Sequence, residues 1–158
     1  MTIVRLIVAG TRDATFADIP IVLAAIKRWI ARNGRPTHVV CGGNAGRKGV
    51  DSTLGVDLIG AHLALKAGIK IDFVPADWSL GPSAGPRRNR IMIWAPVHGL
   101  VVVRHRWSNG SADVLREAIA KWGADSPLIE DVIIEKRPAV RDARKLDTKA
   151  ERKKWRAA

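Results

Sequence analysis

The chain begins with a short apolar segment, followed by a segment whose apolar residues recur at helical spacing. Ile3–Val8 is almost continuously apolar and rich in β-branched residues, and Gly10 follows it closely. After Asp18, apolar side chains recur at intervals of three or four residues, at Ile19, Leu23, Ile26 and Ile30. The first pattern is typical of a buried strand and the second of an amphipathic helix, so we predict a strand, a loop and a helix.

The same order recurs in the next part of the chain. Thr37–Cys41 predicts a second strand, and a glycine-rich loop follows it. The next helix would be capped by Asp57 and stopped by Gly68, because aspartate favours the N-terminal cap and glycine the C-terminal stop. The apolar face predicted for this helix consists of Leu58, Leu63 and Leu65.

Three further strands and another helix complete the pattern. Ile69–Val74 alternates apolar and charged residues, which indicates a strand with one wetter face, at an edge of the sheet. Gly99–Val103 is apolar throughout and predicts a central strand, and Asp131–Glu135 predicts the last one. The helix between these two would begin at Ser111 and end at Gly123, with an apolar side formed by Val114, Leu115, Ala118, Ile119 and Trp122.

Alternating strands and helices predict an α/β fold with a doubly wound, Rossmann-like parallel sheet, because right-handed crossovers place helices on both faces. About five strands in the order 3-2-1-4-5 would put the wetter third strand at an edge. In such sheets ligands bind beyond the carboxyl ends of the strands, where the strand order reverses. We therefore expect a site in the crevice between the first and fourth strands.

The charge is unevenly distributed along the chain. The 158 residues include 27 Lys and Arg against 15 Asp and Glu, a net charge of +12. Residues 136–158 hold ten basic and three acidic residues, which is more than half of that excess. We predict a nucleotide-binding domain over residues 1–135 and a basic tail or helix over 136–158. Such a tail is either a solvated segment, an anionic-surface contact or a nucleic-acid contact made by Arg152, Lys153, Lys154 and Trp155.

Composition narrows the class of protein further. A single cysteine, Cys41, excludes an internal disulfide framework and favours a reducing cytoplasm. No export signal or membrane-spanning segment is visible, since spanning a bilayer takes about 20 apolar residues. Metal-ligand spacing is not found among the four histidines, so we predict no metal site and no cofactor, and give structural or surface roles to His38, His62, His98 and His105.

Two glycine-containing loops follow the first two strands. Gly10–Arg12 places a glycine and an arginine at the predicted crevice, where backbone and guanidinium contact an anion, or where a tight turn carries a surface arginine. It lacks the G-x-G-x-x-G spacing of a dinucleotide site. Gly42–Asp57 is glycine-rich, but Lys48 precedes Gly49 rather than a hydroxyl residue, which argues against a P-loop. Asp57 would either cap the following helix or lie near a ligand.

Two later segments concentrate polar and aromatic residues. Pro75–Arg90 reads as a rigid loop that carries arginines, with Trp78 offering a ring face to a base or sugar, or else as a core tryptophan and a basic helix end. His105–Ser111 leads from the central strand into a helix and suits a phosphate or ribose. A serine and a histidine without a placed acid are poor evidence for nucleophilic catalysis.

Several of these motifs together resemble a known family. Gly10–Arg12, Gly42–Gly43, Gly55–Gly60, Pro75–Trp78 and Ala84–Asn89 are similar to the motifs of the bacterial and phage YspA-type branch of the SLOG superfamily. The resemblance covers about residues 3–123. It implies a Rossmann-like domain that binds a nucleotide or a nucleotide-derived molecule. More distant branches include cytokinin-activating phosphoribohydrolases and the DNA-processing protein DprA.

The sequence also departs from the family pattern. The usual turn after the second strand is opened by residues 44–54, which resemble an insertion. In the phosphoribohydrolases a glutamate and an arginine carry catalysis; Arg88 resembles the arginine, but Val114 stands at the glutamate's place and Asp113 comes one residue early. On a helix one residue rotates a side chain by about 100°, so Asp113 would point elsewhere unless the turn is irregular.

We expect the protein to bind a nucleotide or an ADP-ribose-like molecule as a sensor or binding protein. An N-glycosidase that uses Arg88 and Asp113, with Asp77 as another candidate acid, is the enzymatic alternative, and nucleic-acid binding through the tail is a third. A homodimer is expected from the resemblance, with Trp94 and Trp122 placed either at its interface or in the core. The candidate ligand-binding residues are Gly10, Thr11, Arg12, Gly42, Gly43, Asp57, Asp77, Trp78, Gly85, Arg88, Asn89, Ser108, Gly110 and Ser111.

Overall fold

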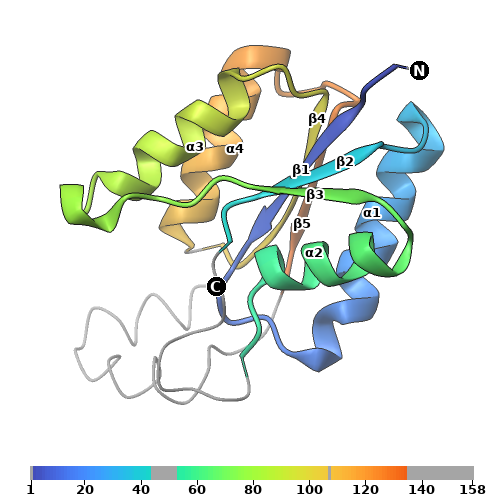
Figure 1. Ribbon diagram of the computed structural model, residues 1–158, viewed down its shortest axis with the longest axis horizontal. Helices are drawn as coiled ribbons and strands as arrows, with labels where there is room; N and C mark the ends of the chain where they lie inside the picture. The colour runs from blue at the N-terminus through green and yellow to red at the C-terminus, as the bar shows by residue number, and fades with distance from the viewer. Residues whose placement is uncertain (1, 44–52, 107, 135–158) are drawn as a thin grey trace.

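A computed structural model describes residues 2–43, 53–106 and 108–134 of the chain (Figure 1). Five strands, four α-helices and two short 3-10 helices alternate along the described part. The strands are β1 (Arg5–Gly10), β2 (His38–Cys41), β3 (Lys70–Phe73), β4 (Gly99–Arg104) and β5 (Ile129–Ile133). The helices are η1 (Phe16–Asp18), α1 (Ile19–Asn33), α2 (Val56–Lys66), η2 (Trp78–Leu80), α3 (Ala84–Trp94) and α4 (Asn109–Trp122).

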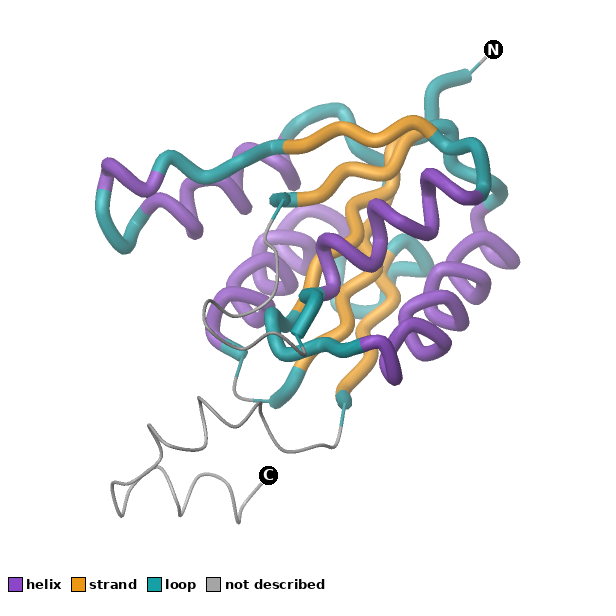
Figure 2. The backbone as a smooth tube through the Cα atoms, turned by 60° about the horizontal axis from the view of Figure 1, so that its bottom comes forward, coloured by secondary structure: helices purple, strands orange, loops and turns teal. Residues whose placement is uncertain are grey.

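The five strands form one parallel sheet in the order β3-β2-β1-β4-β5. Helices α1 and α2 cover one face of the sheet, and α3 and α4 cover the other (Figures 1 and 2). This arrangement confirms the predicted doubly wound α/β class and its strand order. β3 lies at an edge, and β4 lies between β1 and β5 with its first five residues buried, as their hydropathy indicated.

Each face of the sheet carries its own hydrophobic core, because successive side chains of a strand point to opposite faces. Leu6 and Val8 of β1 belong to the core under α1 and α2. Ile7 and Ala9 of the same strand belong to the core under α3 and α4. Because both faces of β1 are buried over Leu6–Ala9, the side chains there must be apolar or small. This explains the continuous apolar run at these residues.

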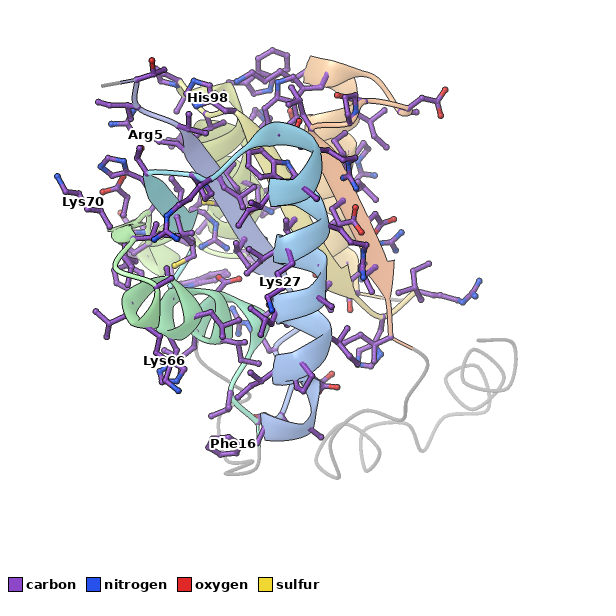
Figure 3. The ribbon with its side chains drawn as sticks, turned by 90° about the vertical axis from the view of Figure 1, so that its right-hand side faces the viewer. Arg5, Phe16, Lys27, Lys66, Lys70 and His98 are labelled. Carbon is purple, nitrogen blue, oxygen red and sulfur yellow. The ribbon has the colours of Figure 1, made fainter. Side chains whose placement is uncertain are left out.

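The two ends of the sheet differ in character. At the N-terminal end, the backbone N–H of Arg5 donates to Nδ1 of His98 at 3.0 Å, and Figure 3 shows these two residues together. Phe16, the first residue of η1, lies at the opposite end of the molecule in the same view. His98 thus has a structural role at the end away from the carboxyl ends of the strands.

The buried face of α1 differs in part from the predicted one. Its buried residues are Val22, Ala25, Ile26 and Trp29, while Ile19 and Ile30 pack only at the margin of the core. Trp29 is 1% exposed, and its indole N–H donates to the carbonyl of Leu128 at 2.9 Å. Its ring lies over Gly99, where an added Cβ would come within 2.6 Å of the indole. Trp29 thus fills the core position that the helical spacing predicts for Ile30.

The apolar face predicted for α2 is wrong at two of its three residues, since only Leu63 packs against the core. Leu58 is 43% exposed and Leu65 69% exposed, whereas the buried residues include Gly60, Ala61 and Ala64. A Cβ added at Gly60 would lie 2.6 Å from Cγ1 of Val8, so the helix backbone packs directly on β1. Small residues bury this face because they permit close approach, and a search for large apolar residues misses them.

The arginine-bearing segment before β4 is a helix rather than a loop. Arg87, Arg88 and Arg90 all belong to α3, which starts at Ala84. Pro86 is compatible with its first turn, where the backbone N–H would have no intrahelical partner. At the other end of α3, Lys121 of α4 donates to the carbonyls of Ile93 and Ala95. The predicted rigid loop is therefore confined to the residues around η2.

Other boundaries differ by a few residues. β5 begins two residues before the predicted Asp131, and Glu135 lies outside the described residues. Phe73 of β3 is 55% exposed, so the alternation in this edge strand does not bury it. Trp122 packs at the margin of the core under α3 and α4, whereas Trp94 is 54% exposed. None of the described helices is long and apolar enough to cross a membrane.

The close approach of α2 to β1 leads to a stability prediction. We expect Gly60→Ala to lower the free energy of unfolding by about 1–3 kcal/mol, because the new methyl group overlaps Val8 in a packed core. Gly110→Ala is the control, since no atom lies within 4 Å of a Cβ added there. Chemical denaturation measures both. Equal stability of the two variants would show that α2 has room to move.

Candidate functional site

A cavity of about 600 Å³ opens at the carboxyl ends of β1 and β4, at the place expected from the reversal of strand order. The residues after β1 form one wall, the N-terminal turns of α3 a second and those of α4 a third. Of the predicted site residues, the structure brings these to the cavity: Gly10, Thr11, Arg12, Asp57, Trp78, Gly85, Arg88, Asn89, Ser108, Gly110, Ser111 and Asp113.

Arg88 forms the charged floor of the cavity. It is only 7% exposed, and its Nη1 donates to the carbonyl of Gly42 at 2.9 Å. Its Nε donates to Oδ1 of Asn89 at 2.9 Å, and Nη1 also reaches the carbonyl of Val74 at 3.4 Å. Burial lowers the pKa of Arg88, while the neighbouring Asp57 carboxylate opposes that shift. The guanidinium is thus a cation held in a fixed place beside the cavity.

Gly42 and Asp57 lie close to this cation. A Cβ added at Gly42 would lie 2.0 Å from Nη1 of Arg88 and 2.9 Å from Oδ2 of Asp57, so both side chains meet over that glycine. Asp57 is 4% exposed and lies in the first turn of α2. Gly55, with φ +80°, occupies the N-cap position, so the prediction that Asp57 caps this helix is wrong.

The glycines near the cavity allow neighbouring strands and side chains to pack closely. A Cβ added at Gly10 would lie 1.9 Å from the carbonyl oxygen of Val103, so β1 and β4 require a glycine there. Gly43 has φ +73°, in the left-handed region that glycine favours. Gly42 and Gly43 are not among the described residues that line the cavity. The structure therefore does not place them where the predicted backbone contacts with a ligand would be made. Gly42 instead leaves room for the guanidinium of Arg88 and accepts its hydrogen bond.

Asn89 connects Arg88 to the opposite wall. Its Nδ2 donates to Oδ2 of Asp113 at 3.0 Å and reaches the carbonyl of Gly110 at 3.3 Å. Asp113 also pairs with Arg116 at 3.4 Å. The prediction that Asp113 would point elsewhere is therefore wrong. The chain of contacts from Asp57 through Arg88 and Asn89 to Asp113 joins three helices around the cavity.

Trp78 and Arg12 lie at the same cavity. The Arg12 guanidinium lies 5.7 Å from the centroid of the Trp78 ring, within the range of a cation–π contact. Trp78 is 53% exposed, which excludes the alternative of a core tryptophan. Arg12 and Arg88 thus line one cavity.

Asp77 has a local role in the structure. Its Oδ1 accepts hydrogen bonds from the backbone N–H and the hydroxyl of Ser79, at 3.1 Å and 2.5 Å. It occupies the N-cap position of η2 and is not among the described residues that line the cavity. The structure therefore does not bring Asp77 to the site, because its carboxylate is turned toward its own short helix.

Three helices begin at the cavity. The first turns of α2, α3 and α4 contribute Asp57, Gly85 and the segment Asn109–Ser111 to its lining. Helix N-termini carry unpaired N–H groups and a positive end of the helix dipole, which favour an anion. Ser108 is the N-cap of α4, and its side chain makes no capping hydrogen bond. These helix ends and the three arginines of the lining offer positions for an anion. The lining also holds three aspartates, Asp13, Asp57 and Asp113.

Sequence reasoning missed two charged residues of the lining, Asp13 and Arg116. Arg116 follows Asp113 by three residues, a spacing that places both on one helix face and was a usable signal. Asp13 is 3% exposed, and its Oδ2 lies 4.0 Å from Nε2 of the fully buried His105. The pair of Asp13 and His105 joins the loop after β1 to the residue after β4. These residues are far apart in the sequence, so the pair could be found only from the tertiary structure.

The other chemistry near the site is limited. Burial, with the nearby Asp57 carboxylate, raises the pKa of the Cys41 thiol to about 11, so the thiol stays protonated at neutral pH. Among the described residues, no group of three or more His, Cys, Asp or Glu side chains could hold a metal ion. The tail candidates Arg152, Lys153, Lys154 and Trp155 lie outside the described residues.

Comparison with known protein families, with curated proteins and with solved structures gave no match.

The contact between Gly42 and Arg88 generates a prediction that a double-mutant cycle tests. We expect Gly42→Ala to lower the free energy of unfolding by about 1–3 kcal/mol, because the methyl group displaces a buried cation from its carbonyl acceptor. In an Arg88→Ala background the same substitution should cost less, by about 1 kcal/mol or more. Denaturant titration of the four proteins measures the coupling, and additive effects would contradict the assigned role of Gly42.

Proposed function

We propose that the chain binds a nucleotide or a nucleotide-derived, ADP-ribose-like molecule in this cavity, as a binding protein or sensor. One observation carries the proposal: the guanidinium of Arg88 is buried at the floor of a cavity that also holds Arg12. The motif resemblance to the YspA-type branch of the SLOG superfamily supports the nucleotide class. The two arginines Arg12 and Arg88, together with the helix N-termini at the cavity, support a phosphorylated ligand.

The physical reason is the cost of burying a charge. An arginine stays protonated, so a buried guanidinium is tolerated only with hydrogen-bond acceptors and an opposite charge nearby. Asp57 and the carbonyl of Gly42 supply part of that need. Arg12 places a second positive charge near enough to lower the pKa of Arg88. A phosphate in the cavity would offset the repulsion between these two cations, and pair with a planar guanidinium fork.

Calorimetric titration with AMP and ADP-ribose tests this proposal. We expect binding by the unmodified protein and an affinity about tenfold or more lower for Arg12→Ala, because hydrogen bonds to charged groups contribute about 1.5–3 kcal/mol. Arg12 is preferred to Arg88 for this test because it is only partly buried, so its removal is less damaging to the fold.

Arg87→Ala is the matched control for that experiment. Arg87 is an exposed arginine in α3, one residue from Arg88, and it is not among the described residues that line the cavity. We expect it to bind as the unmodified protein does. Equal losses in the two variants would mean that overall charge, and not the cavity, attracts the ligand. Absence of binding to both ligands would contradict the proposal.

A second candidate function is cleavage of the N-glycosidic bond of a nucleoside monophosphate. The observation that favours it is the position of Asp113, which lines the cavity with Arg88 and is held by Asn89 at 3.0 Å. In this reaction water adds to the anomeric carbon, the bond to the base breaks, and the base leaves with a proton. Asp113 would activate the water, and Arg88 would pair with the phosphate that positions the sugar.

Chromatographic detection of free adenine released from AMP tests this second candidate. We expect Asp113→Asn to reduce the rate about 100-fold or more, since a positioned acid or base contributes about 10²–10⁴-fold. Arg87→Ala is the control, because Arg87 is exposed and is not among the described residues that line the cavity, so its rate should match that of the unmodified protein. No release by the unmodified protein, or an unchanged rate in Asp113→Asn, would contradict the role of Asp113.

A further inference from the structure

We infer that Trp78 is a specificity-determining residue, which selects ligands carrying a nucleobase over plain sugar phosphates by stacking on the base. The inference rests on the proposed function and names the class of ligand that the cavity favours. It starts from an unusual placement, since a large aromatic ring with 53% of its surface exposed lines a cavity whose floor is polar and charged.

The structure holds the Trp78 ring in place by its edge. A Cβ added at Gly85 would lie 3.3 Å from Cη2 of the indole, so the ring packs against the backbone of the first turn of α3. Trp78 itself belongs to η2, which Asp77 caps through its hydrogen bonds to Ser79. An exposed ring that is held at its edge and at its backbone loses little freedom when a ligand stacks on it, which favours binding.

Trp78 is the one aromatic side chain among the described residues that line the cavity. A nucleotide has an anionic end and a flat apolar end, and the cavity offers one counterpart for each. The arginines and helix N-termini match the phosphate, while Pro82, Pro86 and the indole of Trp78 line the same space with apolar surface. The base is therefore assigned to Trp78 and not to the charged floor.

Arg12 connects the two ends of this arrangement. Its guanidinium lies 5.7 Å from the centroid of the Trp78 ring, so a phosphate paired with Arg12 brings the attached nucleoside close to the indole. A ligand without a base would gain the phosphate contact only. Stacking on an aromatic side chain tolerates different bases, because every base presents a π-face. We therefore expect a preference for nucleotides in general, with little discrimination between bases from Trp78.

Calorimetric comparison of AMP with ribose 5-phosphate tests the inference, since these two ligands share the phosphate and sugar and differ in the base. We expect the unmodified protein to bind AMP at least about fivefold more tightly, as base stacking on aromatic residues contributes this much or more. Trp78→Ala should abolish the preference by weakening AMP binding much more than ribose 5-phosphate binding. Trp78→Phe should restore most of it.

The outcomes separate this inference from the proposed function. If the unmodified protein binds neither ligand, the proposed function fails and this inference fails with it. If it binds both with equal affinity, the phosphate site stands and the inference is overturned. If Trp78→Ala weakens ribose 5-phosphate as much as AMP, or if Trp78→Phe does not recover the preference, Trp78 shapes the cavity without stacking, and the inference is overturned as well.

Discussion

The placement of one buried cation, Arg88, organises the cavity end of this protein. Its guanidinium cannot lose its charge, so the fold must supply acceptors for it, and these come from the segments after β2 and β3 and from the neighbouring Asn89. Asp57 adds the opposite charge from the first turn of α2. Elements that are far apart in the sequence are thus tied together at the carboxyl ends of the strands, where the candidate site lies.

A second constraint is the close packing of the backbone at glycines. This packing makes room for the buried Arg88 cation and its partners. Gly42 leaves the space that the Arg88 guanidinium occupies, and Gly10 lets β1 pass the carbonyl of Val103. Gly60 brings α2 down onto β1, which carries Asp57 toward the cation. Glycines that looked like ligand contacts in the sequence therefore act in large part by allowing charged side chains and strands to approach one another.

Much of the candidate site was predictable from loop chemistry together with strand order. Arg12, Arg88, Asn89 and Ser111 follow strands or begin helices at the same edge of the sheet, so their convergence followed from the doubly wound arrangement. Of the two candidate acids, Asp113 lines the cavity and Asp77 does not, because the carboxylate of Asp77 accepts hydrogen bonds from Ser79 while Asp113 accepts one from Asn89. Hydrogen-bond competition of this kind depends on neighbours that the order of residues does not reveal.

By itself the sequence determined the alternation of strands and helices, the parallel sheet with β3 at its edge, and the position of the crevice, because periodicity, breakers and crossover handedness act locally or follow general rules. Only the tertiary structure decided which face of α2 is buried, that Gly42 seats a guanidinium, and that Trp78 stays exposed beside Arg12. Those features depend on distances between segments remote along the chain, and such distances exist only after the sheet has formed.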